Sequence, residues 1–176
     1  MSGEDFRRTL GEFATGVAVI TAQGPAGLPV GMTMSSFNSV SIDPPLVLFS
    51  VRQGASNFPA MRDARGFAVN VLARDQQALA ERFARTMDDP WDEVGRTLGH
   101  AEAPLLAGAL AHLECEPYAQ YDGGDHVIFV VRVLRHSVRP GRAAPLVFFR
   151  SGYRGLDQGD EAEPAPPADR SLLAPS

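Results

Sequence analysis

Short apolar runs along the chain predict a protein built mainly from β-strands. Each run is rich in Val, Ile, Leu or Phe and is bounded by Gly, Pro, Asp or Asn, a pattern typical of strands and turns. Asp122-Gly123-Gly124 predicts a hairpin turn, because glycine adopts a positive φ without strain. The predicted strands are residues 17–21, 30–41, 46–51, 67–72, 113–121, 127–134 and 146–149.

Three short helices are predicted, at residues 4–14, 56–61 and 75–84. In the first and third, apolar side chains recur three or four residues apart, which is the spacing of one helix face. Each helix starts near a side-chain oxygen that can accept a hydrogen bond from the free N–H groups of a first turn. The candidate N-caps are Ser2 or Asp5, Ser56, and Asp75. The apolar faces consist of Phe6, Leu10, Phe13, Leu79 and Phe83.

The order of these elements indicates the fold class. Six or seven strands with two or three helices show no alternation of strand and helix, which favours an antiparallel barrel or sandwich with peripheral helices over a parallel sheet. After residue 155 the apolar content falls while Pro and acidic residues increase. We therefore expect one domain over residues 1–156 and a disordered tail over residues 157–176.

Charge is concentrated in that tail. Of the formal net charge of -5, the tail contributes -4, so the body of the chain is nearly neutral and has no basic stripe that would bind nucleic acid. No apolar run approaches the roughly 18 residues of a membrane span. The first five residues are acidic and lack the apolar core of a secretory signal, so we expect a cytoplasmic protein.

Several chemistries are not supported by the composition. All 16 basic residues are arginine, so Schiff-base and phosphate-loop lysine chemistry are excluded. The single cysteine, Cys115, cannot form an intrachain disulfide and is expected to be an inert thiol within a strand. The four histidines have no metal-ligand spacing, so no metal site is predicted. Neither a nucleophile elbow nor a Rossmann glycine motif is present.

Residues 33–39, TMSSFNS, hold four hydroxyls and an amide in a segment that must be partly buried. The simpler interpretation is an edge strand with a hydroxylated outer face. The alternative is a strand that offers donors to a planar ligand with polar edges.

Two further candidates also have a structural and a functional interpretation. The sequence Gly124-Asp125-His126 is either part of a turn or a place where a ligand approaches the backbone and Asp125 orients His126. Arg82-Phe83 is either a surface arginine beside a core residue or part of an anion site. Ser56-Asn57 is either a simple helix cap or, at a helix N-terminus, a phosphate site.

Taken together, these segments resemble the short-chain flavin reductases, the small reductase components of two-component flavin-dependent monooxygenases. The resemblance covers about residues 6–156, and its motifs keep their order along the chain. The segments that carry it are FATGVAVIT (13–21), GMTMSSFNSVS (31–41), DPPLV (43–47), GFAVNVL (66–72), residues 76–83, GALA (108–111), EC (114–115), GDH (124–126), PLVFF (145–149) and GY (152–153).

The resemblance implies a split β-barrel, usually a homodimer, that binds flavin near the subunit interface. It implies reduction of FMN or FAD, with FMN as the first expectation, by NADH or NADPH. The reduced flavin would then be released to a flavin-dependent monooxygenase. No nucleic acid, membrane or metal takes part in this scheme.

The resemblance also implies roles for individual residues. His126 is the one residue with a catalytic assignment, because the Gly-Asp-His motif is associated with the nicotinamide nucleotide. The isoalloxazine would contact Met32, Thr33, Met34, Ser35, Ser36, Asn38 and Ser39. The ribityl-phosphate side would contact Ser50, Val51, Arg52, Gln53, Ser56 and Asn57. The phosphate or adenylate side would contact Arg82 and Phe83, and the nicotinamide side Gly124, Asp125, Tyr153 and Arg154.

Because the chain has no lysine, any cationic contact must come from arginine, and the candidates are Arg52, Arg82 and Arg154. Hydride transfer is carried by the cofactors themselves, which agrees with the absence of a nucleophile or an acid–base pair. The alternative functions are a flavoprotein oxidase with tightly bound FMN, a flavin-binding protein without enzymatic activity, and a barrel for an apolar ligand.

Overall fold

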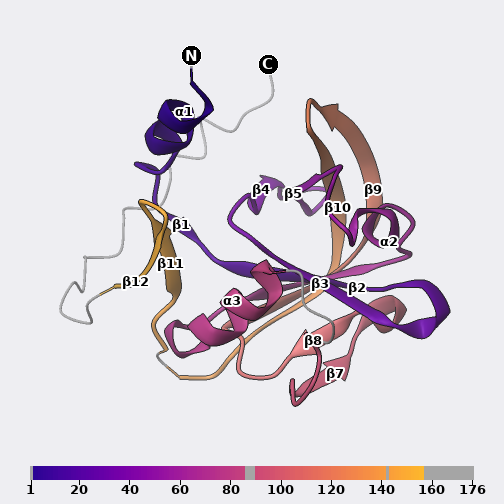
Figure 1. Ribbon diagram of the computed structural model, residues 1–176. Coiled ribbons are helices and arrows are strands. Elements are labelled where there is room, and N and C mark those ends of the chain that lie inside the picture. The colour runs from indigo at the N-terminus through magenta and orange to yellow at the C-terminus, as the bar shows by residue number, and fades with distance from the viewer. Residues whose placement is uncertain (1, 86–89, 142, 157–176) are drawn as a thin grey trace.

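The computed structural model describes residues 2–85, 90–141 and 143–156, and is mainly β and antiparallel, as predicted (Figure 1). The predicted tail, residues 157–176, lies outside the described residues. The described α-helices are α1 (Gly3–Leu10), α2 (Phe58–Arg62) and α3 (Gln77–Ala84), and the short 3-10 turns are Pro25–Gly27, Arg74–Gln76 and His100–Glu102. None of the described helices is long and apolar enough to cross a membrane. The cytoplasmic location stays a prediction.

One seven-stranded sheet forms the centre of the molecule. Its strands, in spatial order, are β3 (Pro29–Met34), β2 (Ala18–Gln23), β6 (Phe67–Val71), β9 (Ala111–Gly123), β10 (His126–Val138), β5 (Leu46–Arg52) and β4 (Asn38–Ser41). A three-stranded sheet contains β1 (Thr15–Gly16), β11 (Leu146–Phe149) and β12 (Gly152–Gly155), and a separate pair contains β7 (Arg96–Leu98) and β8 (Pro104–Leu106).

The central sheet must curl, because its two edge strands follow each other directly in sequence. The edges are β3 and β4, joined only by residues 35–37. In a flat sheet six strand spacings would separate them by about 29 Å, whereas the link spans at most about 14 Å. The single strand predicted over residues 30–41 is therefore wrong: it is two strands on opposite edges.

A serine side chain makes hydrogen bonds to β5 at the point where the predicted strand is interrupted. Ser36 Oγ accepts a hydrogen bond from Ser50 N at 3.0 Å and donates to Ser50 O at 3.4 Å. The hydroxyl thus bonds to β5 in place of a backbone ladder and connects the end of β3 to the far side of the sheet. A hydropathy pattern cannot distinguish this connection from a continuous strand.

The β9–β10 hairpin has a tighter turn than predicted. Asp122 and Gly123 belong to β9, and Gly123 pairs with His126, so that only Gly124 and Asp125 form the loop. Gly124 has φ 77, the conformation that favours glycine at the first loop position of a two-residue hairpin. The turn therefore holds His126 at the first position of β10, as the sequence suggested.

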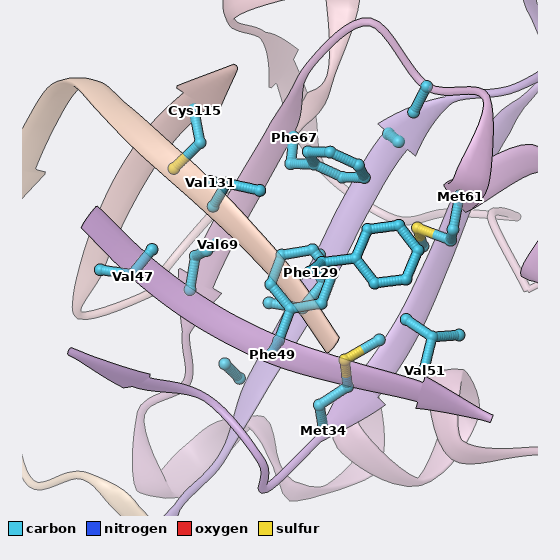
Figure 2. Close-up of a cluster of buried hydrophobic side chains, with 14 residues drawn as sticks. Met34, Val47, Phe49, Val51, Met61, Phe67, Val69, Cys115, Phe129 and Val131 are labelled. Atoms are coloured by element: carbon cyan, nitrogen blue, oxygen red, sulfur yellow. The ribbon is translucent and has the colours of Figure 1, made fainter. Parts of the chain in front are cut away.

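The main core lies on the inner face of the curled sheet. Phe49 and Phe129 stack with ring centroids 5.3 Å apart, and Phe67 meets both rings edge-on at 5.4 and 6.0 Å (Figure 2). All three are fully buried, and truncating such a side chain to alanine typically costs about 3–5 kcal/mol. Met61 from α2 closes one side of this cluster.

A second core fixes α3 beside the sheet. Phe83 and Ala80 are buried, and Leu79 packs on the same cluster, which confirms the predicted apolar face of this helix. The other buried residues of this cluster are Val19, Leu106 and Leu146 in strands, and Val17 and Leu72 next to strand ends.

Two of the predicted helix caps are wrong. Helix α2 begins after Asn57, not Ser56, and the Asn57 side chain donates to Gly31 O at 3.3 Å instead of capping. A 3-10 turn precedes α3, and Gln76 Oε1, not Asp75, accepts the bond from Ala73 N at 3.0 Å. The Asn57 hydrogen bond ties the start of α2 to β3, and the Gln76 hydrogen bond ties the start of α3 to Ala73.

Helix α1 has the predicted cap and an unpacked apolar face. Ser2 Oγ accepts from Asp5 N at 3.1 Å, so Ser2 is the cap of the two candidates. The helix ends at Leu10, earlier than predicted. Phe6, Leu10 and Phe13 are 51%, 56% and 74% exposed, so they do not contribute to the core of the single chain.

Candidate functional site

Two adjoining cavities lie where β3 and β5 end. The smaller, of about 520 Å³, is bounded by these strands and by the tip of the β9–β10 hairpin, and we call it the strand cavity. The larger, of about 820 Å³, lies between β3, the end of α3 and residues 90–96, and we call it the arginine cavity. Met32 and Arg52 line both, so the two cavities adjoin each other.

The strand cavity gathers many of the predicted flavin residues. Ile128 and Met32 give it apolar walls, while the serines and His126 give it polar edges. Because β3 is an edge strand, it also presents backbone groups outside the ladder. The predicted residues that line this cavity are Met32, Thr33, Met34, Ser35, Ser36, Ser50, Val51, Arg52 and His126.

Some hydroxyls of this strand hold the walls together. Thr33 Oγ1 donates to Ala80 O of α3 at 2.7 Å. Ser36 is bound to the backbone of Ser50, as described above. The prediction that this strand offers hydroxyl donors to a ligand therefore applies to Ser35 more directly than to Thr33 or Ser36, whose hydrogens are already used.

The hairpin tip holds His126 in one orientation. Its Nδ1 lies 2.7 Å from Asp125 Oδ1, and its side chain is 41% exposed. An ionised carboxylate only accepts, so Nδ1 carries the hydrogen and Nε2 is the nitrogen left for a ligand. This hydrogen bond, the electrostatic interaction with His126 and, more weakly, that with Arg52 hold the pKa of Asp125 below its usual range.

The end of β5 anchors the same tip. The Gln53 backbone N–H donates to Asp125 O at 3.0 Å, and Gln53 Nε2 donates to Gly124 O at 3.2 Å. Gln53 was predicted to contact the flavin. In this structure it braces the turn that presents His126 and does not line either cavity.

The arginine cavity contains functional candidates that the sequence analysis missed. Arg85 and Arg96 line it together with Arg52, and Trp91 forms part of its aromatic wall. Trp91 meets Phe83 edge-on, with centroids 4.8 Å apart. Apart from the arginines themselves, residues 85–110 gave no pattern that would have marked them.

Arg82 has a different position from the one predicted. It does not line the arginine cavity, and it donates to Asp92 O at 2.6 Å. It therefore braces the segment that carries Trp91. Phe83, Ser56 and Asn57 do line the cavity.

Other predicted residues lie outside both cavities. Asn38 and Ser39 are exposed on β4, where Ser39 N donates to Asn38 Oδ1 at 2.9 Å. Tyr153 packs on Phe148 at 5.4 Å, and desolvation, with a smaller effect of Glu81, raises its pKa. Strand β12, which carries Tyr153 and Arg154, belongs to the separate three-stranded sheet, and neither residue lines either cavity; Figure 1 shows β11 and β12 apart from the β9–β10 hairpin.

The cavity residues favour binding and positioning over covalent chemistry. Cys115 is fully buried, and desolvation, with a smaller effect of Glu114, raises its pKa to about 12. No group of three or more His, Cys, Asp or Glu that could hold a metal ion occurs within residues 2–85, 90–141 and 143–156. Apolar walls, edge-strand backbone groups and nearby arginines suit a flat cofactor with an anionic tail, such as a flavin nucleotide.

Fold and site together describe an antiparallel β protein with two adjoining cavities beside the edge strand β3. The chain belongs to the family described as "Flavin reductase like domain", whose model matches residues 10–157. This confirms the resemblance seen in the sequence.

Individual relatives agree with this assignment. The chain is 44% identical over 147 residues to the FMN reductase (NADH) SmoA of Agrobacterium fabrum, covering 84% of this chain and 82% of that one. It is 39% identical over 162 residues to HsaB of Rhodococcus jostii, the reductase subunit of a flavin-dependent monooxygenase, covering 92% and 81%. The solved structure of the NADH:FAD oxidoreductase SgcE6 of Streptomyces globisporus, in complex with NAD and FAD fragments, has a TM-score of 0.84 at 39% identity, covering 90% and 94%.

Proposed function

We propose that this protein is an NAD(P)H-dependent flavin reductase that supplies reduced flavin to a partner monooxygenase. The observation that carries the proposal is the pair of adjoining cavities, in which His126 lines one and Arg52 lines both. Its relatives SmoA and SgcE6 are named as NADH-dependent reductases of FMN and FAD, and HsaB as a monooxygenase reductase subunit.

When bound, the two cofactors supply the redox chemistry: a hydride passes from nicotinamide C4 to flavin N5, a solvent proton completes the reduced flavin, and NAD(P)⁺ leaves. The protein positions the two reactants. Holding them in the reactive geometry makes a bimolecular reaction effectively unimolecular. In the proposed site, Met32 and Ile128 flank the flavin and Ser35 hydrogen-bonds its edge. His126, oriented by Asp125, holds the nicotinamide nucleotide on the hairpin side.

We further propose that the curled sheet is a split β-barrel and that two chains form a dimer. The Ser36–Ser50 hydrogen bonds, which join the end of edge strand β3 to β5 near the other edge, support the first point. The exposed apolar face of α1 supports the second, since a second copy of this chain would cover it. In such a dimer, Tyr153 and Arg154 of one chain are free to approach the partner's nicotinamide side.

The dimer is tested by light scattering after gel filtration. A mass of two chains, compared with 18.9 kDa for one, is expected. Phe13→Glu should shift the mass toward one chain, because it places a charge in the interface. A monomeric wild-type protein would contradict the proposed dimer but would not contradict the proposed reductase activity.

The activity is tested by steady-state oxidation of NADH and NADPH with added FMN, FAD or riboflavin. Turnover that depends on added flavin is expected. A purified protein that stays yellow through dialysis would favour the oxidase with tightly bound FMN. Flavin binding without NAD(P)H oxidation would favour the non-enzymatic flavin-binding protein, and no flavin binding at all would leave the apolar-ligand barrel.

A further inference from the structure

The tip of the β9–β10 hairpin, which presents His126, is attached to the segment that follows β5. Gln53 makes three hydrogen bonds to this tip. Its backbone N–H donates to Asp125 O at 3.0 Å. Its side-chain Nε2 donates to Gly124 O at 3.2 Å and to Asp122 Oδ1 at 3.4 Å. One residue thus contacts both loop residues of the hairpin and the carboxylate that precedes them.

The tip has little stiffness of its own. Gly123 and Gly124 are consecutive, and glycine loses more conformational freedom than any other residue when it is held in one geometry. No heavy atom lies within 4 Å of the place where a Cβ atom of Gly124 would be. Because His126 pairs with Gly123 at the first position of β10, its place in the wall of the strand cavity depends on how the tip is held.

Gln53 lies outside both cavities, although the residue before it lines both. Arg52 contributes to the strand cavity and to the arginine cavity, whereas the side chain of Gln53 is bound to the hairpin tip. A residue in this position affects a bound cofactor through the tip and not by direct contact.

We propose that Gln53 is a positioning residue for the nicotinamide nucleotide: it fixes the hairpin tip, and through the tip it holds His126 at the wall of the strand cavity. The inference rests on the proposed function, because it takes His126 as the residue that holds the nicotinamide nucleotide. It replaces the role that the resemblance implied, in which Gln53 contacts the ribityl-phosphate side of the flavin.

The experiment is steady-state NADH oxidation by the full-length protein at saturating flavin, with a separate flavin titration in the absence of NADH. The variants are Gln53→Ala and Gln53→Glu. Alanine removes both side-chain hydrogen bonds and keeps the backbone bond. Glutamate keeps the length of the side chain but turns a donor into a carboxylate that faces two acceptors, Gly124 O and Asp122.

Gln120→Ala is the matched control. Gln120 is an exposed glutamine of β9, and its Nε2 donates to Arg62 O at 3.1 Å. It therefore makes the same kind of hydrogen bond from the same hairpin, away from the tip.

Gln53→Ala should raise the KM for NADH about threefold, which is the lower part of the range for a hydrogen bond because this one is exposed. Because the cofactors themselves carry the hydride, kcat at saturating NADH should stay close to that of wild type. Flavin affinity should also stay close to that of wild type. Gln53→Glu should raise the KM further through repulsion at the tip, and Gln120→Ala should change none of these values.

A double-mutant cycle separates positioning from a general loss of structure. In the His126→Ala protein, Gln53→Ala should have little further effect on the KM for NADH, because the group that Gln53 positions is already gone. A merely structural role of Gln53 would change the kinetics by the same factor in both backgrounds.

Three results would overturn the inference. Weaker flavin binding in Gln53→Ala would assign Gln53 to the flavin, as the resemblance implies. Additive effects in the cycle would show that Gln53 acts independently of His126. A wild-type KM for NADH in both Gln53 variants would show that the tip keeps its position without this residue. In each case flavin-dependent NADH oxidation by wild type would persist, whereas its absence would refute the proposed function instead.

Discussion

His126 lies directly opposite Arg52 across the β5–β10 ladder, at the place where the two cavities meet. Antiparallel pairing brings the side chains of opposite residues within about 5 Å at their Cβ atoms. One residue pair therefore links the hairpin tip, assigned to the nicotinamide nucleotide, to the junction assigned to the flavin phosphate. Substitutions at the hairpin tip should therefore affect the nicotinamide nucleotide, and substitutions at the junction should affect the flavin.

Replacing His126 with alanine should raise the KM for NADH about tenfold, because a hydrogen bond to the nucleotide is lost. Flavin affinity should change little, because Met32, Ser35 and Ile128, which are proposed to hold the isoalloxazine in the cavity that His126 also lines, remain in place. Steady-state kinetics with NADH varied, together with a flavin titration, gives both numbers. His136→Ala is the control, as His136 lies exposed on the same strand outside both cavities. Wild-type kinetics in His126→Ala would remove the assigned role.

Asp125 should titrate below the usual range of aspartate, because its pKa is lowered mainly by the hydrogen bond to His126. A carboxyl whose folded pKa is lowered stabilises the fold at pH values above its unfolded pKa, and that contribution is lost as pH falls through the folded pKa. Carboxyl carbon NMR shifts measured against pH give the midpoint. In His126→Ala the midpoint should return toward the ordinary value; an unchanged midpoint would mean that another group sets it.

Arg82→Ala should weaken flavin binding even though Arg82 does not line the cavity. Its bond to Asp92 O holds the segment with Trp91, so its loss should loosen the aromatic wall. Trp91 is the single tryptophan, and its emission should therefore shift in this variant. A hydrogen bond of this kind is worth about 1 kcal/mol, so a loss of roughly fivefold in affinity is expected. Weaker binding without any change in emission would instead point to direct contact.

Cys115 should resist thiol reagents in the folded protein. It is fully buried, and only the thiolate reacts, so a pKa of about 12 keeps the reactive fraction negligible near neutral pH. Because the folded pKa lies above the unfolded value, the thiol's contribution to stability is complete below about pH 8.5 and declines as pH rises toward the folded value. Labelling with iodoacetamide should occur at the rate of unfolding. Fast labelling of native protein would contradict the burial.

Asn70→Ala should destabilise the fold by roughly 3 kcal/mol, because buried backbone groups lose their partners. Asn70 Nδ2 donates to Val19 O at 3.0 Å, and Asn70 Oδ1 accepts from Leu106 N at 2.8 Å, so the side chain joins β8 to the central sheet. Urea unfolding measures the change. The exposed Asn38→Ala should stay within about 0.5 kcal/mol of wild type. A neutral Asn70→Ala would show that water replaces the amide.

The strands with continuous apolar, β-branched sequences could be predicted, because residues buried on the inner face of the sheet must be apolar. The predictions for residues 46–51 and 67–72 agree with β5 and β6 to within a residue. Residues 30–41 also have strand propensity throughout, but propensity does not say which neighbour a strand takes. Tertiary pairing divides them between opposite edges. Strand β12, with glycines at both ends, offered no apolar pattern.

The part of the candidate site that lies on strands could be predicted from the sequence, and the part that lies on loops could not. Met32 to Ser36 are consecutive in sequence, and so are Ser50 to Arg52. Strand geometry brings these two segments to one cavity. The resemblance extended this set to Asn38, which the break after β3 carries to the other sheet edge. Arg85 and Arg96 line one cavity together with Trp91, which packs on Phe83 of α3, and local sequence does not encode this tertiary packing.

Gly31 has a consequence for redesign of the pocket. A Cβ atom there would lie 2.9 Å from two ring carbons of Phe83 and 3.1 Å from Trp91. The absence of a side chain at this position is thus what allows helix α3 to rest against strand β3. Enlarging residue 31 by one methyl group would push this aromatic wall outward, so the width of the arginine cavity is set by strand β3 as well as by helix α3.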